Sequence, residues 1–381
     1  MSPFLIGILA VVGFLCTLIP AALTLMNMRE FHRCPPQGPV QAVSVLVPAR
    51  NEANAICRLI SDVLASRGVQ LELLILDDES TDGTGDLVAK IATDEPRLQL
   101  LRGTPLPDGW CGKQFACATL AKHASNEILL FLDVDVSLAP DAINRSLAYL
   151  DISRADLVSG FPKQITHSFL EWLVLPLIHY LLLGYLPIHR SRLTGDIGMA
   201  AGCGQWFLTH RKSYFAAGGH EAIKASLHDG IMLPRAYRRA GLTTDIFDAS
   251  DIASCRMYSQ SIDVCVGLAK NATEGIGSPK TILPFTVLLA GGSILPIGLV
   301  TTGFLDGWHA WSTWTIALAL IAAALTYLPR CLNAYRFQES TLSVLAHPLG
   351  IAVFLGIQWY AFIRRSLGCH TSWRGRMLKP Q

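Results

Sequence analysis

Two carboxylates that follow an apolar run are the first residues in this sequence with evident chemistry. Asp133 and Asp135 come directly after residues 128–132, all of which are aliphatic or aromatic. Such a run predicts a buried strand, and the carboxyl end of a strand is where open α/β sheets bind ligands. Carboxylate oxygens are ligands that Mg2+ or Mn2+ prefers, and Mg2+ usually takes one or two of them beside water and phosphates. The pair predicts a site for a metal-bound phosphate; an ordinary solvated strand end is the alternative.

Polar residues also follow two earlier predicted strands. The first strand leads into a segment with Arg50 and Glu52, and the second leads into Asp78. We expect them at the same sheet edge as the Asp133 pair, and for Asp78 we favour contact with a nucleotide base or ribose. The following residues 82–84 are interpreted as a turn and a helix cap.

Two further charged residues lie near predicted helix starts. Lys113 follows a glycine at a loop-to-helix junction, where its ammonium and the helix N-terminus can both face a diphosphate. An ordinary surface lysine is the alternative. Asp229 precedes the helical pattern 234–240, so a simple N-cap role is also open, and the helix either begins at Pro234 or kinks there.

The elements that must position these residues alternate in type between residues 40 and 279. Short aliphatic runs alternate with longer amphipathic segments, which predicts βαβ units around a mainly parallel sheet, an α/β fold. The predicted strands are residues 43–47, 71–76, 98–101, 128–132 and 157–160, and the predicted helices are 54–66, 84–92, 113–123 and 141–150.

Composition indicates a membrane protein. The mean hydropathy is +0.38 and only 16% of residues are charged, so much of the surface cannot face water. Residues 3–28 hold no charge, which suffices for a crossing of about 20 residues. No basic residue precedes this segment, whereas Arg29 and Arg33 follow it. We therefore expect an uncleaved N-terminal anchor over residues 1–33, followed by a cytoplasmic domain.

Three more apolar stretches, 282–304, 308–328 and 343–363, predict membrane segments over residues 282–363, before a basic tail at 364–381. If all three cross, the basic tail lies outside, against the positive-inside rule. A re-entrant segment near Gly291 or Pro348 would resolve this conflict.

The apolar stretch 169–188 poses a different problem. If this stretch crossed the membrane once, the carboxylates before it and the polar residues after it would lie on opposite sides of the membrane. Because Pro176, Gly184 and Pro187 interrupt it, we expect an interfacial element that lies along the bilayer.

Net charge and cysteine usage exclude other classes. The net charge of +2 is too small to argue for a nucleic acid partner. The ten cysteines show no zinc spacing, so we interpret them as reduced thiols. No protein partner is indicated.

The joint pattern resembles glycosyltransferase family 2. The order Pro-x-Arg-Asn-Glu at 48–52, Asp-Asp-x-Ser-x-Asp-x-Thr at 77–84 and Asp-x-Asp at 133–135 is typical of this family of GT-A fold, which uses nucleotide-diphosphate sugars. Residues 109–117 are similar to the Gly-Trp-x-Gly-Lys-x-x-Ala-Cys segment of membrane-bound members. These members act on hydrophobic acceptors and include ceramide glucosyltransferases and bacterial enzymes associated with carotenoids and hopanoids.

The resemblance implies roles position by position. Asp78 would hold the nucleoside, with Arg50 and Glu52 in the same pocket, and Lys113 would face the diphosphate. Asp135 and Asp133 would hold Mg2+ or Mn2+. The family places a general base after a Gly-Gly-His element, which here is residues 218–220, and the matching aspartate is Asp229.

Two later segments are matched less completely. The Gln-x-x-Arg-Trp motif of processive members corresponds to residues 253–257, where only Arg256 is retained. We therefore expect transfer of one sugar, with Arg256 near the phosphates. Trp373-Arg374-Gly375-Arg376 resembles a terminal Trp-x-Gly-Arg that either meets the diphosphate or contacts anionic lipid. The segment 199–206 either lines the sugar site, with Trp206 stacking, or is a core strand.

Together these features predict an inverting, metal-dependent glycosyltransferase in a bacterial inner membrane, its catalytic domain in the cytoplasm. The expected donor is a nucleotide sugar, UDP-linked, and the expected acceptor is a hydrophobic lipid alcohol or acid. A polyprenyl-phosphate glycosyltransferase and a non-catalytic nucleotide-binding membrane protein are the alternatives.

Overall fold

The computed structural model describes residues 2–258, 261–309, 311–368, 371–373 and 376–378. The chain divides into two compact units. We call Phe31–Ile165 together with Arg190–Met257 the sheet unit. We call Met1–Glu30, Thr166–His189 and Tyr258–Gln381 the helical unit.

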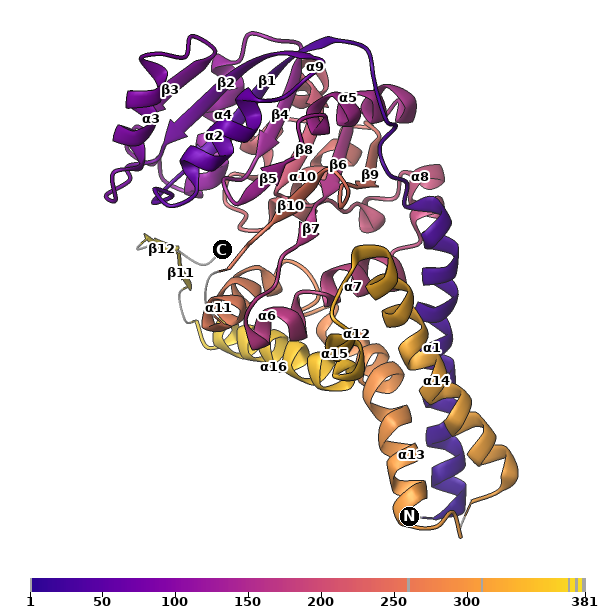
Figure 1. Cartoon of the computed structure of the whole chain (residues 1–381). Coiled ribbons are helices and arrows are strands. Elements are labelled where there is room, and N and C mark those ends of the chain that lie inside the picture. The colour runs from indigo at the N-terminus through magenta and orange to yellow at the C-terminus, as the bar shows by residue number, and fades with distance from the viewer. Residues whose placement is uncertain (1, 259–260, 310, 369–370, 374–375, 379–381) are drawn as a thin grey trace. The chain divides into compact units, whose positions relative to one another are not determined.

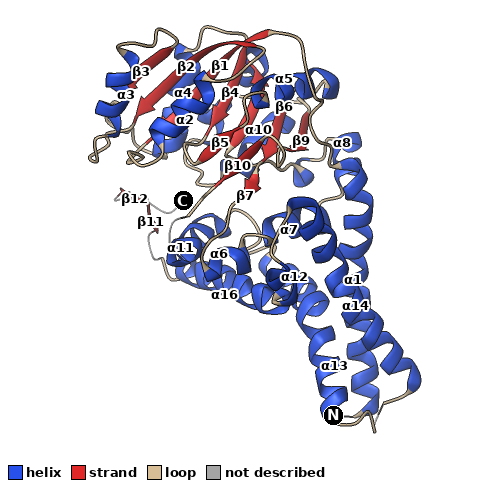
Figure 2. Cartoon of the chain, viewed as in Figure 1, coloured by secondary structure: helices blue, strands red, loops and turns tan. Residues whose placement is uncertain are grey.

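A seven-stranded sheet organises the sheet unit, in the order β3-β2-β1-β4-β8-β6-β9. All neighbours are parallel except β8, which is antiparallel to both β4 and β6 (Figures 1 and 2). The predicted mainly parallel α/β architecture is thus confirmed. The strands are β1 (Gln41–Ala49), β2 (Val69–Asp77), β3 (Leu98–Arg102), β4 (Ile128–Leu132), β6 (Leu157–Phe161), β8 (Trp206–His210) and β9 (Thr244–Asp248).

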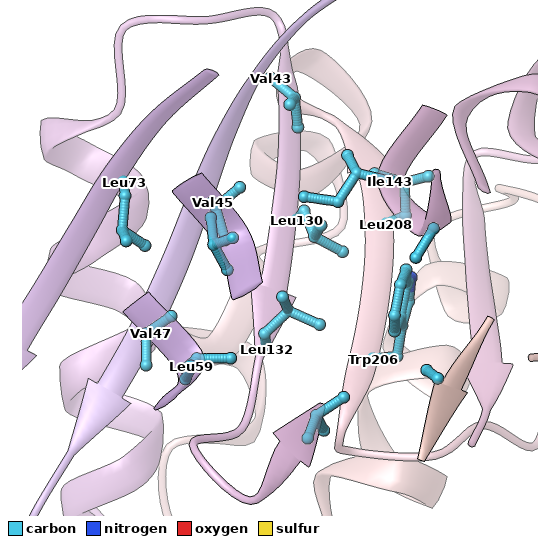
Figure 3. Packing of buried hydrophobic residues seen from close by; sticks show 14 of the residues in the cluster. Val43, Val45, Val47, Leu59, Leu73, Leu130, Leu132, Ile143, Trp206 and Leu208 are labelled. Carbon is cyan, nitrogen blue, oxygen red and sulfur yellow. The ribbon is translucent and has the colours of Figure 1, made fainter. Parts of the chain in front are cut away.

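Helices cover both faces of this sheet. On one face, Val43, Val45 and Val47 of β1 share a core with residues of α2 and α5, as Figure 3 shows for Leu59 and Ile143. On the other face, Leu46 packs in a core with residues of α4 and α10. Both faces are buried, which explains why the central strands are continuous apolar runs. The helices are α2 (Ile56–Leu64), α3 (Thr84–Ala92), α4 (Gly112–His123), α5 (Ala142–Ser153), α9 (Arg211–Ala216) and α10 (Asp229–Arg239).

A small second sheet lies beside the carboxyl end of β4. Its order is β5-β10-β7, from β5 (Val136–Leu138), β10 (Ala253–Cys255) and β7 (Lys163–Gln164). β10 is antiparallel to β5, so a segment more than a hundred residues later in the chain is paired beside Asp133 and Asp135. This pairing was not expected from the sequence.

The helical unit contains the candidate membrane spans. Among the described residues, three helical stretches are long and apolar enough to cross a membrane: Pro3–Glu30, Ile282–Leu305 and Thr313–Phe337. The second is α12 (Ile282–Leu289) and α13 (Leu295–Leu305), joined by one π-helical turn, Ala290–Ile294. A Cβ on Gly292 would lie 2.9 Å from the carbonyl oxygen of Cys16, so the glycine permits close packing against α1 (Pro3–Glu30).

The last predicted membrane stretch differs from expectation. It forms α15 (Thr341–Leu345) and α16 (His347–Ser366), and neither is among the candidate spans found in the described residues. The preceding span is α14 (Thr313–Phe337), which begins five residues later than the predicted stretch at 308. The remaining elements of the unit are α6 (Phe169–Val174), α7 (Leu177–Tyr185), α11 (Ser261–Ala272) and the paired strands β11 (Thr371–Trp373) and β12 (Arg376–Leu378).

The apolar segment Thr166–His189 interrupts the sheet unit in sequence. The bent helix pair Phe169–Tyr185 and Ile188–Thr194 is a candidate fourth span by length and composition if the two helices are taken together as one span. However, β6 before the segment pairs directly with β8 after it. Both ends of the segment must therefore lie on the same side of any bilayer, which is incompatible with a single crossing. Its interfacial position stays a prediction.

Candidate functional site

The turn after β4 carries the two carboxylates and is anchored from both sides. The backbone N–H of Asp133 donates to the carbonyl of Gln205 at 3.2 Å, and that of Arg256 donates to the carbonyl of Asp135 at 3.3 Å. Gln205 immediately precedes β8, and Arg256 immediately follows β10. The two sheets together therefore determine where the Asp133 and Asp135 side chains lie.

Lys113 connects Asp133 to Asp229. Its ammonium nitrogen lies 2.6 Å from Oδ1 and 2.8 Å from Oδ2 of Asp133. The same nitrogen lies 2.9 Å from Oδ2 of Asp229 and donates to the carbonyl of Gly204 at 3.2 Å. Three predicted site residues, from β4, α4 and α10, thus meet at one ammonium group.

Gly204 makes this arrangement sterically possible. A Cβ at this position would lie 2.2 Å from Oδ1 of Asp229 and 2.7 Å from its Cγ. Real Cβ atoms essentially never approach that closely, so any side chain here would displace the carboxylate.

The cluster combines strong charges with burial. Burial alone would lower the pKa of Lys113, but the Asp133 and Asp229 carboxylates outweigh it and raise that pKa well above its ordinary value. Burial raises the pKa of Asp133 to about 6, against the attraction of the Lys113 ammonium. For Asp229 the balance is opposite: burial raises its pKa, but Lys113 outweighs burial and lowers it to about 2. At neutral pH all three groups are ionised.

Asp135 lies in a different environment from Asp133. Burial raises its pKa, and a hydrogen bond from the Cys255 thiol to its carboxylate partly offsets this effect. Gln205 in turn donates a hydrogen bond from Nε2 to Sγ of Cys255. Oδ1 of Asp135 is buried and has no hydrogen-bond partner in the described part of the chain.

That orphaned oxygen fits a metal ion, since a buried carboxylate oxygen without a donor is a costly group that a cation would satisfy. The described residues contain no group of three or more His, Cys, Asp or Glu placed to hold a metal. A cation at Asp135 would therefore take its other ligands from Asp133, substrate or water.

The predicted nucleotide residues gather at the ends of β1 and β2. Arg50 donates from Nη1 to the carbonyl of Asp78 at 2.5 Å and lies 3.7 Å from the Asp78 carboxylate. The backbone N–H of Glu52 donates to Oγ1 of Thr84 at 2.8 Å. Asp78 is buried and Glu52 is half-buried, so the pocket residues are brought together as expected.

Asp229 differs from the sequence prediction in its local structure. Helix α10 begins at Asp229 itself and runs through Pro234, so the helix neither starts nor stops at that proline. The N-cap residue is His228, so the N-cap alternative for Asp229 is wrong. Pro234 is the sixth residue of α10, beyond the four N-terminal positions without helical partners, so the helix forgoes one backbone hydrogen bond at this position.

The other predicted residues have different outcomes. The Arg256 side chain is exposed after β10. Trp206 is fully buried in the core of the sheet unit as the first residue of β8, so it cannot stack on a sugar (Figure 3). The core-strand alternative holds for Trp206 alone, because residues 200–205 form a loop before that strand. Arg374 and Gly375 lie outside the described residues.

Sequence reasoning missed Gly204, Gln205 and Cys255, which support the carboxylates. None has a chemical signature by itself, because a glycine, an amide and a thiol each have many ordinary roles. The sequence analysis also missed the ion pair between Arg102 and Asp77, in which Nη1 lies 2.8 Å from Oδ2. The two residues are paired directly across strands β3 and β2.

Comparisons with known proteins identify a family model and relatives that this chain resembles. Residues 44–214 match the model of glycosyl transferase family 2. 4,4'-Diaponeurosporenoate glycosyltransferase of Staphylococcus aureus (strain USA300) is 25% identical over 347 residues, which is 88% of each chain. The protein of the same name from Staphylococcus haemolyticus (strain JCSC1435) is 24% identical over 254 residues, covering 65% of this chain and 66% of that protein.

One solved structure is similar enough to compare folds. Mannosyltransferase PcManGT from Pyrobaculum calidifontis, solved in complex with GDP-Man and Mn2+, is 18% identical and has a TM-score of 0.55. The alignment covers 93% of this chain and 99% of that chain. At this identity the likeness shows a shared fold, in agreement with the GT-A expectation.

Proposed function

We propose that the chain is a glycosyltransferase that moves one sugar from a nucleotide-diphosphate donor to a lipid acceptor, with a divalent cation and inversion at the anomeric carbon. The match of residues 44–214 to the glycosyl transferase family 2 model and the similarity to the staphylococcal glycosyltransferases support this proposal. The donor we propose is a UDP-hexose. The acceptor is a hydrophobic alcohol or acid.

The observation that carries this proposal is the group formed by Lys113, Asp133 and Asp229. One ammonium lies within 3 Å of two carboxylates that come from different elements. An ammonium held at a helix start suits the negative charge of a departing nucleoside diphosphate. The adjoining carboxylate Asp229 is ionised at neutral pH, which is the form a general base requires, while the ammonium that lowers its pKa to about 2 also weakens it as a base.

We propose that Asp135, together with Asp133, holds Mg2+ or Mn2+. The unpartnered Oδ1 of Asp135 supports this assignment. A bound divalent cation supplies charge stabilisation for the leaving diphosphate. The similar Pyrobaculum structure contains GDP-Man and Mn2+, so Mn2+ and both UDP- and GDP-sugars belong in the first assay.

The nucleoside would lie at the ends of β1 and β2, where Asp78 would bind the base or ribose and Arg50 and Glu52 would line the pocket. The exposed Arg256 would add positive charge beside the phosphates. The Arg50–Asp78 contact supports this placement because it holds both side chains at one strand edge.

The acceptor assignment is supported by the relatives and by the apolar helices. The staphylococcal relatives are named for 4,4'-diaponeurosporenoate, a name that denotes a carboxylate, and the described part of this chain has three candidate membrane spans. We propose an integral protein of a bacterial inner membrane. Arg29 and Arg33 follow the first candidate span, which supports a cytoplasmic sheet unit under the positive-inside rule.

The test uses membranes from a host that expresses the full chain, supplied with radiolabelled UDP-glucose or GDP-mannose, Mn2+ and a bacterial lipid extract. We expect label in the organic phase, and loss of it with EDTA or in Asp135→Ala. The matched control is Asp94→Asn, which removes an exposed carboxylate of the same unit. Transfer that is unchanged in Asp135→Ala would refute the proposed metal site.

Asp229→Asn separates the acceptor classes. An alcohol must lose a proton as it attacks, so loss of a general base should slow transfer about a hundredfold or more. A carboxylate or polyprenyl-phosphate acceptor is already anionic, and most of the rate should then remain. Absence of both transfer and donor hydrolysis with every donor would favour the non-catalytic nucleotide-binding alternative.

A further inference from the structure

Helix α16 presents an apolar stripe on its exposed side. Together with α15, this side carries exposed residues every three or four positions, and none of them is charged: Leu342, Leu345, Leu349, Ala352, Gly356, Tyr360, Ile363 and Leu367. Residues at this spacing lie on one face of a helix. The exposed large side chains are between 51% and 74% accessible, so the rest of the described unit does not cover them.

The opposite side of α16 is packed inside the helical unit. Ile351, Phe354 and Leu355 belong to a core that includes residues of α6 and α7. Gly350 permits the closest approach, because a Cβ there would lie 2.7 Å from the carbonyl oxygen of Leu173. The helix is therefore fixed on one side and apolar on the other.

Its direction differs from that of the candidate spans. Figure 1 shows α16 running across the direction of α1, which belongs to the same unit. In addition, α16 is not among the described helices that are apolar enough to span. Two arginines, Arg364 and Arg365, stand at its C-terminal end.

The distribution of basic residues distinguishes a topology in which α16 crosses the membrane from one in which it does not. Residues 1–28 and 281–329 contain no Lys or Arg. If α1, α12–α13 and α14 all cross the membrane, the start of α1, the end of α13 and the start of α14 lie on the side away from the sheet unit, and none of these ends has a basic residue. Helix α16 then begins on the same side of the membrane as the sheet unit. A crossing by α16 would move five basic residues to the opposite side: Arg364, Arg365, Arg374, Arg376 and Lys379.

We propose that α15 and α16 lie in the plane of the membrane, at the leaflet that faces the sheet unit, with the apolar stripe in the acyl–headgroup boundary. Arg364 and Arg365 contact anionic lipid headgroups, and the tail after residue 366 stays on the catalytic side. This inference goes beyond sugar transfer and rests on three crossings by the other spans.

A matched pair of glycine substitutions tests the orientation of the helix. Gly356 lies in the stripe and Gly298 lies in α13, and a Cβ added to either meets no atom within 4 Å. Lysine fits sterically at both sites. In an interfacial helix the lysine reaches water, whereas in the interior of a span it opposes insertion. We expect Gly356→Lys to retain, within about twofold, the parent amount of folded protein in membranes, and Gly298→Lys to lose about tenfold.

The amount is measured by the fluorescence of a C-terminal green fluorescent protein fusion of the full chain after size-exclusion chromatography in detergent. Equal losses, or equal tolerance, in the two variants would overturn the proposal.

The parent chain gives a second readout that does not depend on any variant folding. A C-terminal green fluorescent protein should fluoresce and a C-terminal alkaline phosphatase should be inactive, because both report a cytoplasmic C-terminus. An active phosphatase with a dark fluorescent fusion would show that α16 crosses. Neither readout involves sugar transfer, so failure here is distinguishable from failure of the proposed reaction.

Discussion

Replacement of Gly204 by alanine tests the geometry around Asp229 without removing any functional group. Gly204 does not have a positive φ, so alanine introduces no backbone strain. Its Cβ would lie 2.2 Å from Oδ1 of Asp229, where an ordinary contact is longer than 3.0 Å. The carboxylate must therefore move by about 1 Å, away from its position beside the Lys113 ammonium. Misplacement of a catalytic group by about 1 Å costs about a hundredfold in rate, or about 2.7 kcal/mol.

The assay measures transfer to extracted lipid and thermal unfolding of the same preparation. We expect Gly204→Ala to lose about a hundredfold in turnover and to keep a cooperative melting transition. The control is Gly198→Ala, the same change in the same unit, whose Cβ would meet its nearest atom at 3.3 Å. This variant should transfer sugar at nearly the parent rate.

A double-mutant cycle then identifies the cause. In an Asp229→Ala background the clash no longer exists, so Gly204→Ala should add little further loss. Full activity of Gly204→Ala in the parent background would refute the reasoning, because the carboxylate would then have no required position. Additive losses would show that the alanine acts through a partner other than Asp229.

Three other changes have defined outcomes. Lys113→Met leaves two neighbouring carboxylates without their cation, so we expect a stability loss of up to about 3 kcal/mol and, in thermal melts, a larger stabilisation by Mn2+ than in the parent chain. Cys255→Val removes the hydrogen bond to Asp135 and should raise the Mn2+ concentration for half-maximal transfer about tenfold, whereas Cys255→Ser retains a donor and should stay near the parent value. Burial would raise the pKa of Glu72, but hydrogen bonds from Ser44 and the Ser125 backbone outweigh it and lower that pKa below 4.5. The ionised Glu72 therefore stabilises the fold above its unfolded-state pKa, and this stabilisation is lost as the pH falls through its folded-state pKa. The difference in melting temperature between the parent and Glu72→Gln should accordingly shrink below about pH 4.5. A pH-independent difference for Glu72→Gln, equal Mn2+ requirements in the two Cys255 variants, or an unchanged melt for Lys113→Met would each contradict the corresponding contact.

The α/β architecture was predictable because each central strand is buried on both faces and therefore is a continuous apolar run. Residues 128–132 were predicted and observed with the same bounds. Predicted strands at 43–47 and 71–76 were each too short, since the observed β1 and β2 extend into polar residues such as Gln41 and Gln70 that parallel pairing holds in place. The antiparallel position of β8 was not predictable, since strand direction depends on contacts distant in sequence.

The site was predictable where residue type specifies chemistry. Asp133, Asp78 and Asp229 are carboxylates at element ends, and the structure places each at the expected edge. The direct contact of Lys113 with Asp133 and Asp229 depends on how α4 and α10 pack against one sheet, which no local pattern encodes. Pro234 was misleading because a proline inside a helix removes one backbone hydrogen bond without necessarily ending the helix, and α10 continues through it to Arg239.

Three of the predicted apolar stretches are long and apolar enough to span in the described part of the chain, whereas the last one is not among these candidates. Hydropathy alone does not distinguish a span from a helix with one packed side and one apolar side. In α16, buried polar residues such as Gln358 and His347 lower the mean hydropathy while the exposed side remains apolar. Only the packing of the unit separates these two contributions.

The antiparallel strand β8 has a consequence for biosynthesis. Strands β3, β2, β1 and β4 are complete once residue 132 has left the ribosome, but β8 begins only at Trp206. The apolar segment Thr166–His189 emerges between them. We therefore expect the first half of the sheet to fold early and the second half to wait until the intervening segment has been synthesised. A chain stalled between these stages would expose the edge of β4, which makes prompt targeting to the membrane a protection against aggregation.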